Sequence, residues 1–279
     1  MKTNKTDYTK PNFKGRRLIM GDSHGGFKAF KVALERANFD YDNDLLINLG
    51  DCCDGWSQSK EVIDELLKMK HLVYLLGNHD EWCLDYYAGD MKVNNKISPV
   101  DIWYVQGGES TIKSLGDYDN QDPKYLDFLR SGLLYYKIQD ECEDLPIIFS
   151  HANIPNKMYN MDKLVQNKQT NIFIWERWLI REAARMRNTW DTVDDRFKEI
   201  YLGHSAISNL MGVEEHCWKP QKMTNIWGMD TNAAYDGKVS IMDIDTKEIY
   251  QSDFVFKYYP DERGRNKESY NEYLKRESL

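Results

Sequence analysis

The chain has 279 residues, a formal net charge of −8 at pH 7, and 41% hydrophobic residues. This length and composition predict one globular domain with a large core and exclude wholesale disorder. The negative charge argues against binding to long nucleic acids, which depends on many Lys and Arg contacts to phosphate, but it does not exclude a small nucleotide. The five cysteines contain no C-x-x-C pair, so neither a disulfide framework nor a structural zinc module is indicated.

The chain divides into three expected regions. Residues 1–13 are polar and are predicted to be a flexible N-terminus without the apolar core of a signal peptide. Residues 14–256 carry the expected domain, and the highly charged tail 257–279 is expected to be a surface helix or a frayed end. No apolar stretch approaches the length of a membrane helix. We therefore expect a cytoplasmic protein without a membrane partner, located in the host cytoplasm if a phage encodes it.

Three similar units of strand, loop and helix open the domain. They read RRLIMGDSHGG, LLINLGDCCDGW and HLVYLLGNHDE, and each places polar side chains directly after an apolar run. Because the carboxyl ends of parallel strands meet at one sheet edge, these side chains should lie together. The expected strands are residues 17–20, 44–49 and 71–76, and the expected helices are 27–37, 60–69 and 81–87.

Hydrophobic periodicity is lost over residues 88–132, where glycines and prolines interrupt the pattern. We expect a helical or irregular cap insertion beside the site there. Further strands are predicted at 133–138, 146–149 and 199–202, and a helix at 175–186. The segments 225–229, 239–244 and 248–254 predict a second, mostly antiparallel set of strands.

Four of the six histidines directly follow predicted strands. Any one of them alone is better explained as a surface or hydrogen-bonded histidine. Together with neighbouring carboxylates and an amide, they suit two borderline divalent ions such as Mn, Fe or Zn, because oxygen and imidazole ligands are mixed and no thiolate is needed. The set is too large for one structural zinc ion. Its members are His24, His79, His151, His204, Asp22, Asp51, Asp54 and Asn78.

Five motifs in this order, GDSHG, GDCCD, GNHD, SHA and GHS, resemble those of the calcineurin-like metallophosphoesterases of the phosphoprotein phosphatase family. The similarity is greatest to the bacteriophage lambda type of serine/threonine protein phosphatase, and bacterial diadenosine tetraphosphatases are related. The resemblance implies an α/β fold, namely a two-sheet α/β/β/α sandwich with a cap insertion and a dinuclear metal site at the strand ends.

The resemblance also assigns roles to individual residues. A hydroxide shared by the two ions would attack phosphorus. His79 resembles the general acid, and Asp54 would orient its ring. Arg177, in IWER, and Asn78 would bind the phosphate. The metal ligands implied are Asp22 and His24 for the first ion, Asp51 as the bridge, and Asn78, His151 and His204 for the second ion.

Four positions depart from the family pattern. Gly55 and Trp56 replace an Arg-Gly pair whose arginine would contact phosphate, Asp80 replaces a glutamate, and Asn232 replaces a common glycine. The shorter Asp80 could accompany loss of a nearby arginine. Trp56 is either a loop residue packed on the cap or a stacking surface for a base or an aryl group.

Three functions fit these residues. The first is a metal-dependent phosphomonoesterase, most simply a serine/threonine protein phosphatase using Mn. The second, favoured by the missing arginine and by Trp56, is a nucleotide hydrolase or phosphodiesterase acting on dinucleoside polyphosphates or cyclic nucleotides. The third is a degenerate phosphate-binding module, against which the complete ligand set argues. The expected partner is thus a phosphorylated protein or a small phosphoester.

Overall fold

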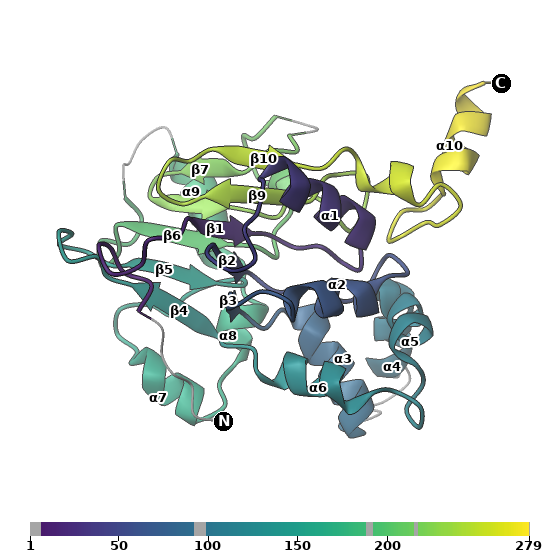
Figure 1. Cartoon of the computed structure of the whole chain (residues 1–279), viewed down its shortest axis with the longest axis horizontal. Coiled ribbons are helices and arrows are strands. Elements are labelled where there is room, and N and C mark those ends of the chain that lie inside the picture. Colours follow the sequence, from purple (N-terminus) through teal and green to yellow (C-terminus); the bar gives the residue numbers. More distant parts are fainter. Residues whose placement is uncertain (1–6, 92–98, 188–191, 215–216, 279) are drawn as a thin grey trace.

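Two five-stranded sheets organise the chain in the computed structural model, which describes residues 7–91, 99–187, 192–214 and 217–278 (Figure 1). The first sheet has the order β10-β9-β1-β2-β3 and the second the order β4-β5-β6-β8-β7. The strands of the first are β1 (Arg17–Met20), β2 (Leu45–Asn48), β3 (His71–Tyr74), β9 (Ser240–Asp243) and β10 (Ile249–Gln251). Those of the second are β4 (Tyr135–Ile138), β5 (Ile147–Ser150), β6 (Glu199–Leu202), β7 (Gln221–Met223) and β8 (Ile226–Gly228).

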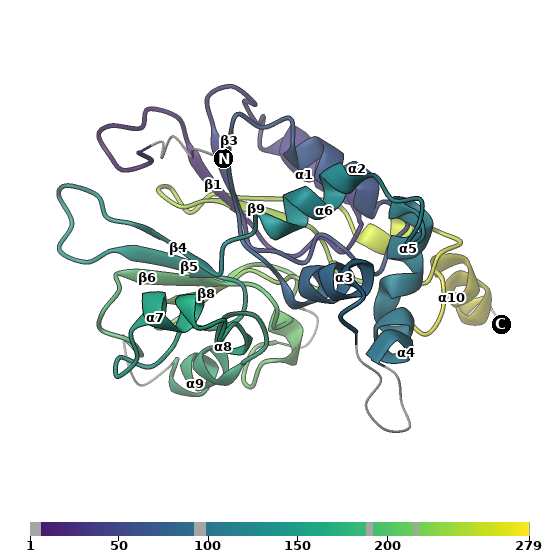
Figure 2. The ribbon, with the colours of Figure 1, turned by 90° about the horizontal axis from the view of Figure 1, so that it is seen from below.

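Helices lie on both outer sides of the sheets. Figure 2 shows α1, α2 and α6 on one side and α7, α8 and α9 on the other. The helices are α1 (Phe27–Arg36), α2 (Ser59–Leu66), α3 (Asn78–Ala88), α4 (Pro99–Trp103), α5 (Glu109–Leu115), α6 (Pro123–Arg130), α7 (Met161–Gln166), α8 (Asn171–Ile174), α9 (Trp178–Met186) and α10 (Tyr270–Glu277). Short helical turns are η1 (Tyr104–Gly108), η2 (Ile207–Asn209) and η3 (Val255–Tyr258). Among the described residues, no helix is both long and apolar enough to cross a membrane.

Alternating side chains of the strands build separate apolar layers. Ile19 of β1 packs between the sheets in one cluster with Tyr201 of β6. The neighbouring Leu18 points to the opposite face, where it joins a cluster with Phe30 of α1. A third cluster joins β6 to α9. Because successive strand residues face opposite sides, these clusters give four layers, and the predicted α/β/β/α sandwich is confirmed.

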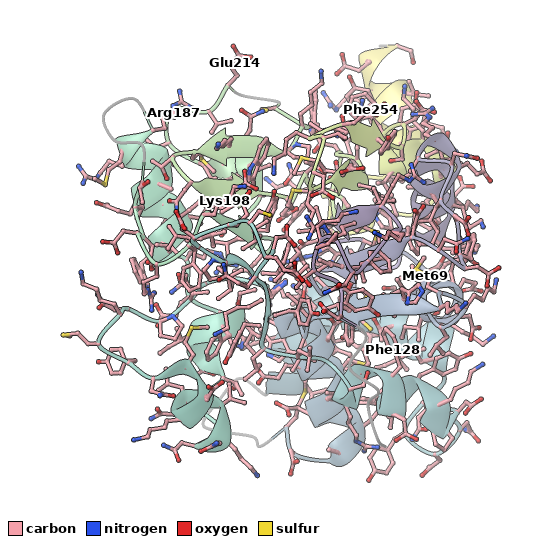
Figure 3. The ribbon with its side chains drawn as sticks, turned by 60° about the vertical axis from the view of Figure 1, so that its left-hand side comes forward. Met69, Phe128, Arg187, Lys198, Glu214 and Phe254 are labelled. Atoms are coloured by element: carbon pink, nitrogen blue, oxygen red, sulfur yellow. The ribbon has the colours of Figure 1, made fainter. Side chains whose placement is uncertain are left out.

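The helices at residues 99–130 pack beside the first sheet. α5 and α6 contact α2, and α6 also contacts α3. In Figure 3, the labelled Met69 and Phe128 belong to one buried cluster there, whereas Arg187 and Glu214 extend from the molecular surface. This segment is therefore joined to the domain by its own apolar contacts.

The three last predicted strands do not form one antiparallel set, so this expectation is wrong. β8 lies in the second sheet, parallel to β6, while β9 and β10 join the first sheet, with β9 antiparallel to β1. The apolar pattern identified strands but not their partners, because β6 and β9 are buried along their whole length and offer no polar face that fixes a neighbour.

Parallel pairing of strands places the loops that carry the predicted ligands at one edge of the sheets. β1, β2 and β3 are parallel to one another, as are β5, β6 and β8. The chain leaves each strand at its carboxyl end, so the following loops gather along the same edge of the two sheets.

Candidate metal centre and active site

The structure brings the nine side chains singled out in the sequence to this edge. All are buried except Arg177, which is half-buried at the start of α9 and lines the same cavity as Asp51 and His79. Strand β1 is followed by Asp22 and His24, β2 by Asp51 and Asp54, β3 by Asn78 and His79, β5 by His151, and β6 by His204.

The loops that carry these side chains have an unusual backbone. His24, Asp51, Asp54 and His204 all have positive φ, at 48°, 52°, 69° and 61°. This conformation costs an L-residue on the order of 1 to 2 kcal/mol and persists only where surrounding contacts fix it. The backbone N–H of His24 donates to the carbonyl of Asp51 at 2.9 Å, which locks two of these loops together.

Asp51 lies between two groups of possible ligands. Its Oδ2 is 3.6 Å from His24 Nε2, and its Oδ1 is 3.5 Å from His151 Nε2. Within 4.8 Å of one another lie ligand atoms of His24, Asp51 and His79 on one side and of Asp51, His151 and His204 on the other. Asp51 is common to both groups, which is the geometry a bridging carboxylate requires.

Backbone carbonyls set the tautomers of the histidine rings. The Nδ1 of His24 lies 2.8 Å from the carbonyl oxygen of Asp54, and the Nδ1 of His151 lies 2.7 Å from that of Leu49. A carbonyl only accepts, so each Nδ1 carries the proton and each Nε2 presents a lone pair toward Asp51. In His204 the nitrogen near a carbonyl is Nε2, which lies 3.2 Å from the carbonyl oxygen of Trp175 and therefore carries the proton. Nδ1 is left with the lone pair that could bind a metal. Rings oriented in this way are suited to metal binding.

The charges of the site fit divalent cations. Burial, with added repulsion from Asp230 and Asp51, raises the pKa of Asp22, and burial raises the pKa of Asp51 to about 6. Burial also lowers the pKa of His151 to about 4, so this ring is neutral at pH 7. Buried carboxylates beside neutral imidazoles are costly without a counter-charge, and two divalent ions would supply it. The donor set therefore fits a dinuclear centre.

Asp54 and His79 form a pair beside this centre. The Nδ1 of His79 lies 2.7 Å from Oδ2 of Asp54, and its Nε2 lies 3.0 Å from Nη1 of Arg265. Because a guanidinium can only donate, Nε2 accepts and Nδ1 donates its proton to Asp54. Trp103 Nε1 and Thr111 Oγ1 also donate to the Asp54 carboxylate, at 2.7 and 2.6 Å. Asp54 is thus placed to orient the His79 ring.

Asp80 and Trp56, two departures from the family pattern, have structural roles other than those expected from the sequence. Asp80 contacts no arginine among the described residues; its carboxylate accepts from the N–H of Cys52 at 2.9 Å and from the hydroxyl of Tyr74 at 2.8 Å, which supports the loop after β2. Trp56 is fully buried and stacks on Tyr259 rather than on the cap, so it offers no surface to a base.

Asn232 takes the conformation that a glycine would. Its φ is +66°, a region that asparagine tolerates better than most residues. Its side-chain amide donates to the hydroxyl of Ser208 at 3.0 Å. This substitution leaves the turn intact.

Sequence reasoning missed several residues of the site. Asp230 is buried, lines the cavity, and follows β8 at the same sheet edge, so its strand-end position was a usable signal. Trp103, Thr111 and Arg265 gave no such signal. They come from segments without periodicity or with many similar charges, and only the fold brings them to Asp54 and His79.

Comparison with models of protein families shows to which family the chain belongs. The family model described as calcineurin-like phosphoesterase matches residues 15–224. The chain belongs to this family. It is therefore a metallophosphoesterase, an enzyme that hydrolyses phosphoric esters and is of the dinuclear metal type.

Relatives of this phosphoesterase carry two kinds of name. Serine/threonine-protein phosphatase 1 of Salmonella typhimurium is 23% identical over 224 residues, which cover 80% of this chain and 89% of the relative. The symmetrical bis(5'-nucleosyl)-tetraphosphatase of Hamiltonella defensa is 34% identical over 137 residues, 49% of this chain and 43% of the relative. A solved structure described as a putative diadenosine tetraphosphatase aligns with a TM-score of 0.54 at 17% identity, covering 87% of this chain and 95% of that one. The structural likeness supports the fold alone.

Proposed function

We propose that this metallophosphoesterase is a phosphomonoesterase of the serine/threonine protein phosphatase type, or one acting on small phosphomonoesters. The observation that carries the proposal is the position of Asp51, whose two carboxylate oxygens face His24 and His151 on opposite sides. The ligands we propose are Asp22, His24 and Asp51 for one ion, and Asp51, Asn78, His151 and His204 for the other. We propose Mn for both, with Fe or Zn as alternatives, because the donors are oxygen and imidazole.

Bound ions would activate a water and neutralise charge on the phosphoryl oxygens. The chain's own residues do the rest. Arg177 lines the cavity next to Asp51 and binds phosphate oxygens through its planar guanidinium. In the structure His79 Nε2 accepts from Arg265, so it must be released by the guanidinium and take up a proton before it can deliver one to the leaving oxygen. Asp54 holds the ring through Nδ1 and stabilises its charged form.

The cavity has a size suited to a phosphoryl group with a small attached group. Its volume is about 320 Å³, and its walls combine charged side chains with the indole rings of Trp82 and Trp175. Ligand sites in proteins begin at roughly this volume. A phosphorylated serine or threonine side chain fits such a space, with the peptide remaining outside.

The aromatic wall favours a second candidate function. Trp82 and Trp175 are partly buried and line the cavity, their ring centroids are 4.8 Å apart, and the rings meet at 65°. Indole faces that line a binding site stack on nucleobases. Hydrolysis of a dinucleoside polyphosphate is therefore the alternative, and a relative with that name supports it.

A substrate panel with Mn present tests the proposal. The panel contains p-nitrophenyl phosphate, bis-p-nitrophenyl phosphate, a phosphoserine peptide, a cyclic nucleotide and diadenosine tetraphosphate. We expect kcat/KM for the peptide and p-nitrophenyl phosphate to exceed that for the diesters by at least about tenfold. Faster turnover of diadenosine tetraphosphate than of the peptide would favour the second function. Metal-loaded protein that turns over none of them would be a binding module.

We further propose a cytoplasmic location and kinship with the bacteriophage-type enzymes. All five cysteines are free and three of them are buried, which suits a reducing compartment. The IWER motif at Arg177 supports the kinship.

A further inference from the structure

The segment after β10 returns to the active site. The backbone N–H of Arg265 donates to the carbonyl of Ala234 at 3.0 Å, and its guanidinium lies 5.2 Å from the ring centre of Tyr235. From there Nη1 reaches His79 Nε2 at 3.0 Å, while Nη2 donates to the side-chain oxygen of Gln106. Arg265 therefore lines the cavity that also holds Asp51.

The loop after β2 leaves room for this arginine. A Cβ atom built on Gly55 would lie 3.8 Å from Cγ of Arg265 and 3.1 Å from the carbonyl oxygen of His24. Gly55 also has φ +132°, which L side chains rarely adopt. A long side chain at residue 55 and the guanidinium of Arg265 would thus compete for one space.

Trp56 holds the returning segment in place. Its Nε1 donates to the carbonyl of Ala233 at 2.7 Å, and its ring stacks on Tyr259 with centroids 5.1 Å apart. A Cβ on Gly264 would approach the same ring to 2.7 Å, and Gly264 has φ +56°. Only a glycine lets the backbone lie this close to the indole, directly before Arg265.

Within the part of the chain that the structure describes, the side-chain contacts of the Arg265 guanidinium are with neutral groups. Arg263, two residues earlier, pairs with Glu272 at 2.8 Å and is exposed. Among the described residues, no carboxylate forms an ion pair with Arg265, whose side-chain contacts are an imidazole, an amide and an aromatic ring. Phosphate oxygens make stronger, charge-assisted bonds with a guanidinium than a neutral imidazole does. A bound phosphate would therefore draw Arg265 from Nε2 and leave that atom free.

We propose that Arg265 is a phosphate-binding residue, which supplies from the C-terminal segment the guanidinium that the loop lacks at Gly55. With Arg177 it makes the site selective for phosphomonoesters, because a terminal phosphate carries two charges and a diester one. This inference rests on the proposed function and deepens it. It also gives one reason for three features that the sequence left separate, namely Gly55, Trp56 and the charged tail.

Matched variants of the tail test the proposal. Arg265→Ala and Arg265→Lys are compared with Arg263→Ala, which removes an exposed arginine from the same segment. With Mn-loaded protein, kcat/KM for p-nitrophenyl phosphate and for bis-p-nitrophenyl phosphate are measured, together with the Kd of inorganic phosphate by calorimetry, metal content and thermal unfolding. We expect Arg265→Ala to lower monoester kcat/KM by about 10 to 100-fold and to weaken phosphate binding similarly, while diester hydrolysis changes less than about threefold. Arg265→Lys should recover part of the loss, and Arg263→Ala should match wild type.

A second variant tests the docking of the segment without removing the arginine. Gly264→Ala should displace the backbone from Trp56 and reproduce the loss of Arg265→Ala on the monoester. Unchanged phosphate binding and an unchanged monoester-to-diester ratio in folded Arg265→Ala would overturn the inference. Higher activity of Arg265→Ala would also overturn it, since the arginine would then be an inhibitory cover on His79. Both results differ from failure of the proposed function, in which wild-type protein itself shows no turnover of monoesters.

Discussion

His79 and Asp54 are joined by a hydrogen bond of 2.7 Å although they lie on different segments, His79 in the first turn of α3 and Asp54 in the loop that follows β2. Two further donors, Trp103 and Thr111, hold the same carboxylate from the helices at residues 99–115. Asp54 therefore connects the insertion to the ring that we propose as the general acid. The insertion acts on the site through this carboxylate.

His79→Asn should separate acid catalysis from other roles. An alkyl phosphate needs a proton on its leaving oxygen, so kcat should fall by about 10² to 10⁴-fold, the range typical of general acid catalysis. The loss should be much smaller for p-nitrophenyl phosphate, whose leaving group is stable without a proton. Steady-state kinetics on the two substrates, with metal content measured in parallel, provide the check. Equal losses on both would indicate that His79 serves the metals or the structure instead.

Thr111→Val should show that the insertion supports the same step. The change removes the hydroxyl that donates to Asp54 at 2.6 Å and accepts from its backbone N–H at 2.9 Å. Leaving these buried groups without partners should cost on the order of 1 to 3 kcal/mol in stability. As with His79→Asn, we expect a larger loss for the alkyl phosphate than for p-nitrophenyl phosphate, but kcat for the alkyl phosphate should fall only about 3 to 30-fold.

The double variant makes this test specific. If Thr111 acts through Asp54 and His79, adding Thr111→Val to His79→Asn should cause little further loss of kcat. Losses that multiply would mean that Thr111 acts on the site by another route. Thr246→Val, at an exposed threonine remote from the cavity, is the control for the substitution itself.

Asp51→Asn should remove metal from both positions. One neutral amide cannot replace a carboxylate whose oxygens face His24 and His151, so both groups of ligands lose charge and geometry. We expect metal content below about one ion per chain and no measurable hydrolysis. Chelation of wild-type protein should abolish activity and lower the melting temperature, and added Mn should restore both. Wild-type metal content in Asp51→Asn would exclude Asp51 as the bridge.

Local patterns in the sequence were sufficient for the sheet edge and its ligand loops. β1 and β6 have the predicted bounds, the other predicted strands differ by a few residues at their ends, and β7 was not predicted. The reason is physical: each unit is an apolar run, a glycine and polar side chains, and parallel strands must bring such loops together. The expected helix at 175–186 begins only at Trp178, because Trp175 and Arg177 have non-helical backbone angles.

What the sequence could not supply depends on contacts between distant segments. Arg265 and His79 are 186 residues apart, and no local pattern distinguishes Arg265 from the other arginines of the tail. The pairings of β8 with β6 and of β9 with β1 were not predicted for the same reason, whereas the antiparallel pair of β9 and β10 agrees with the expectation. The absence of an arginine at residue 55 was visible, but its replacement could be found only in space.

Glu65 gives a prediction on stability outside the active site. It lies on α2, is 2% exposed, and bonds to Lys31 Nζ at 2.7 Å and Lys68 Nζ at 2.6 Å. Burial alone would raise the pKa of Glu65, but hydrogen bonds from Lys31, Lys68 and Tyr41 outweigh it and lower the pKa from 4.5 to about 2. The folded protein therefore binds this proton less readily than the unfolded chain does.

The sign of the pH dependence follows from this lowered pKa. Stability from Glu65 is fully present above the unfolded pKa of 4.5 and is lost as the pH falls through about 2. Glu65→Gln should thus lower the free energy of unfolding at pH 7 by on the order of 1 to 2 kcal/mol, since the charges are partly screened. The difference from wild type should shrink at pH 3. Urea unfolding at both pH values measures this difference, with wild type and variant both freed of metal by a chelator. Glu109 is an exposed ion-pair partner of Lys113, so Glu109→Gln is the control and should change stability little. A difference that is the same at pH 3 and pH 7 would show that packing of Glu65, and not its charge, links α2 to α1.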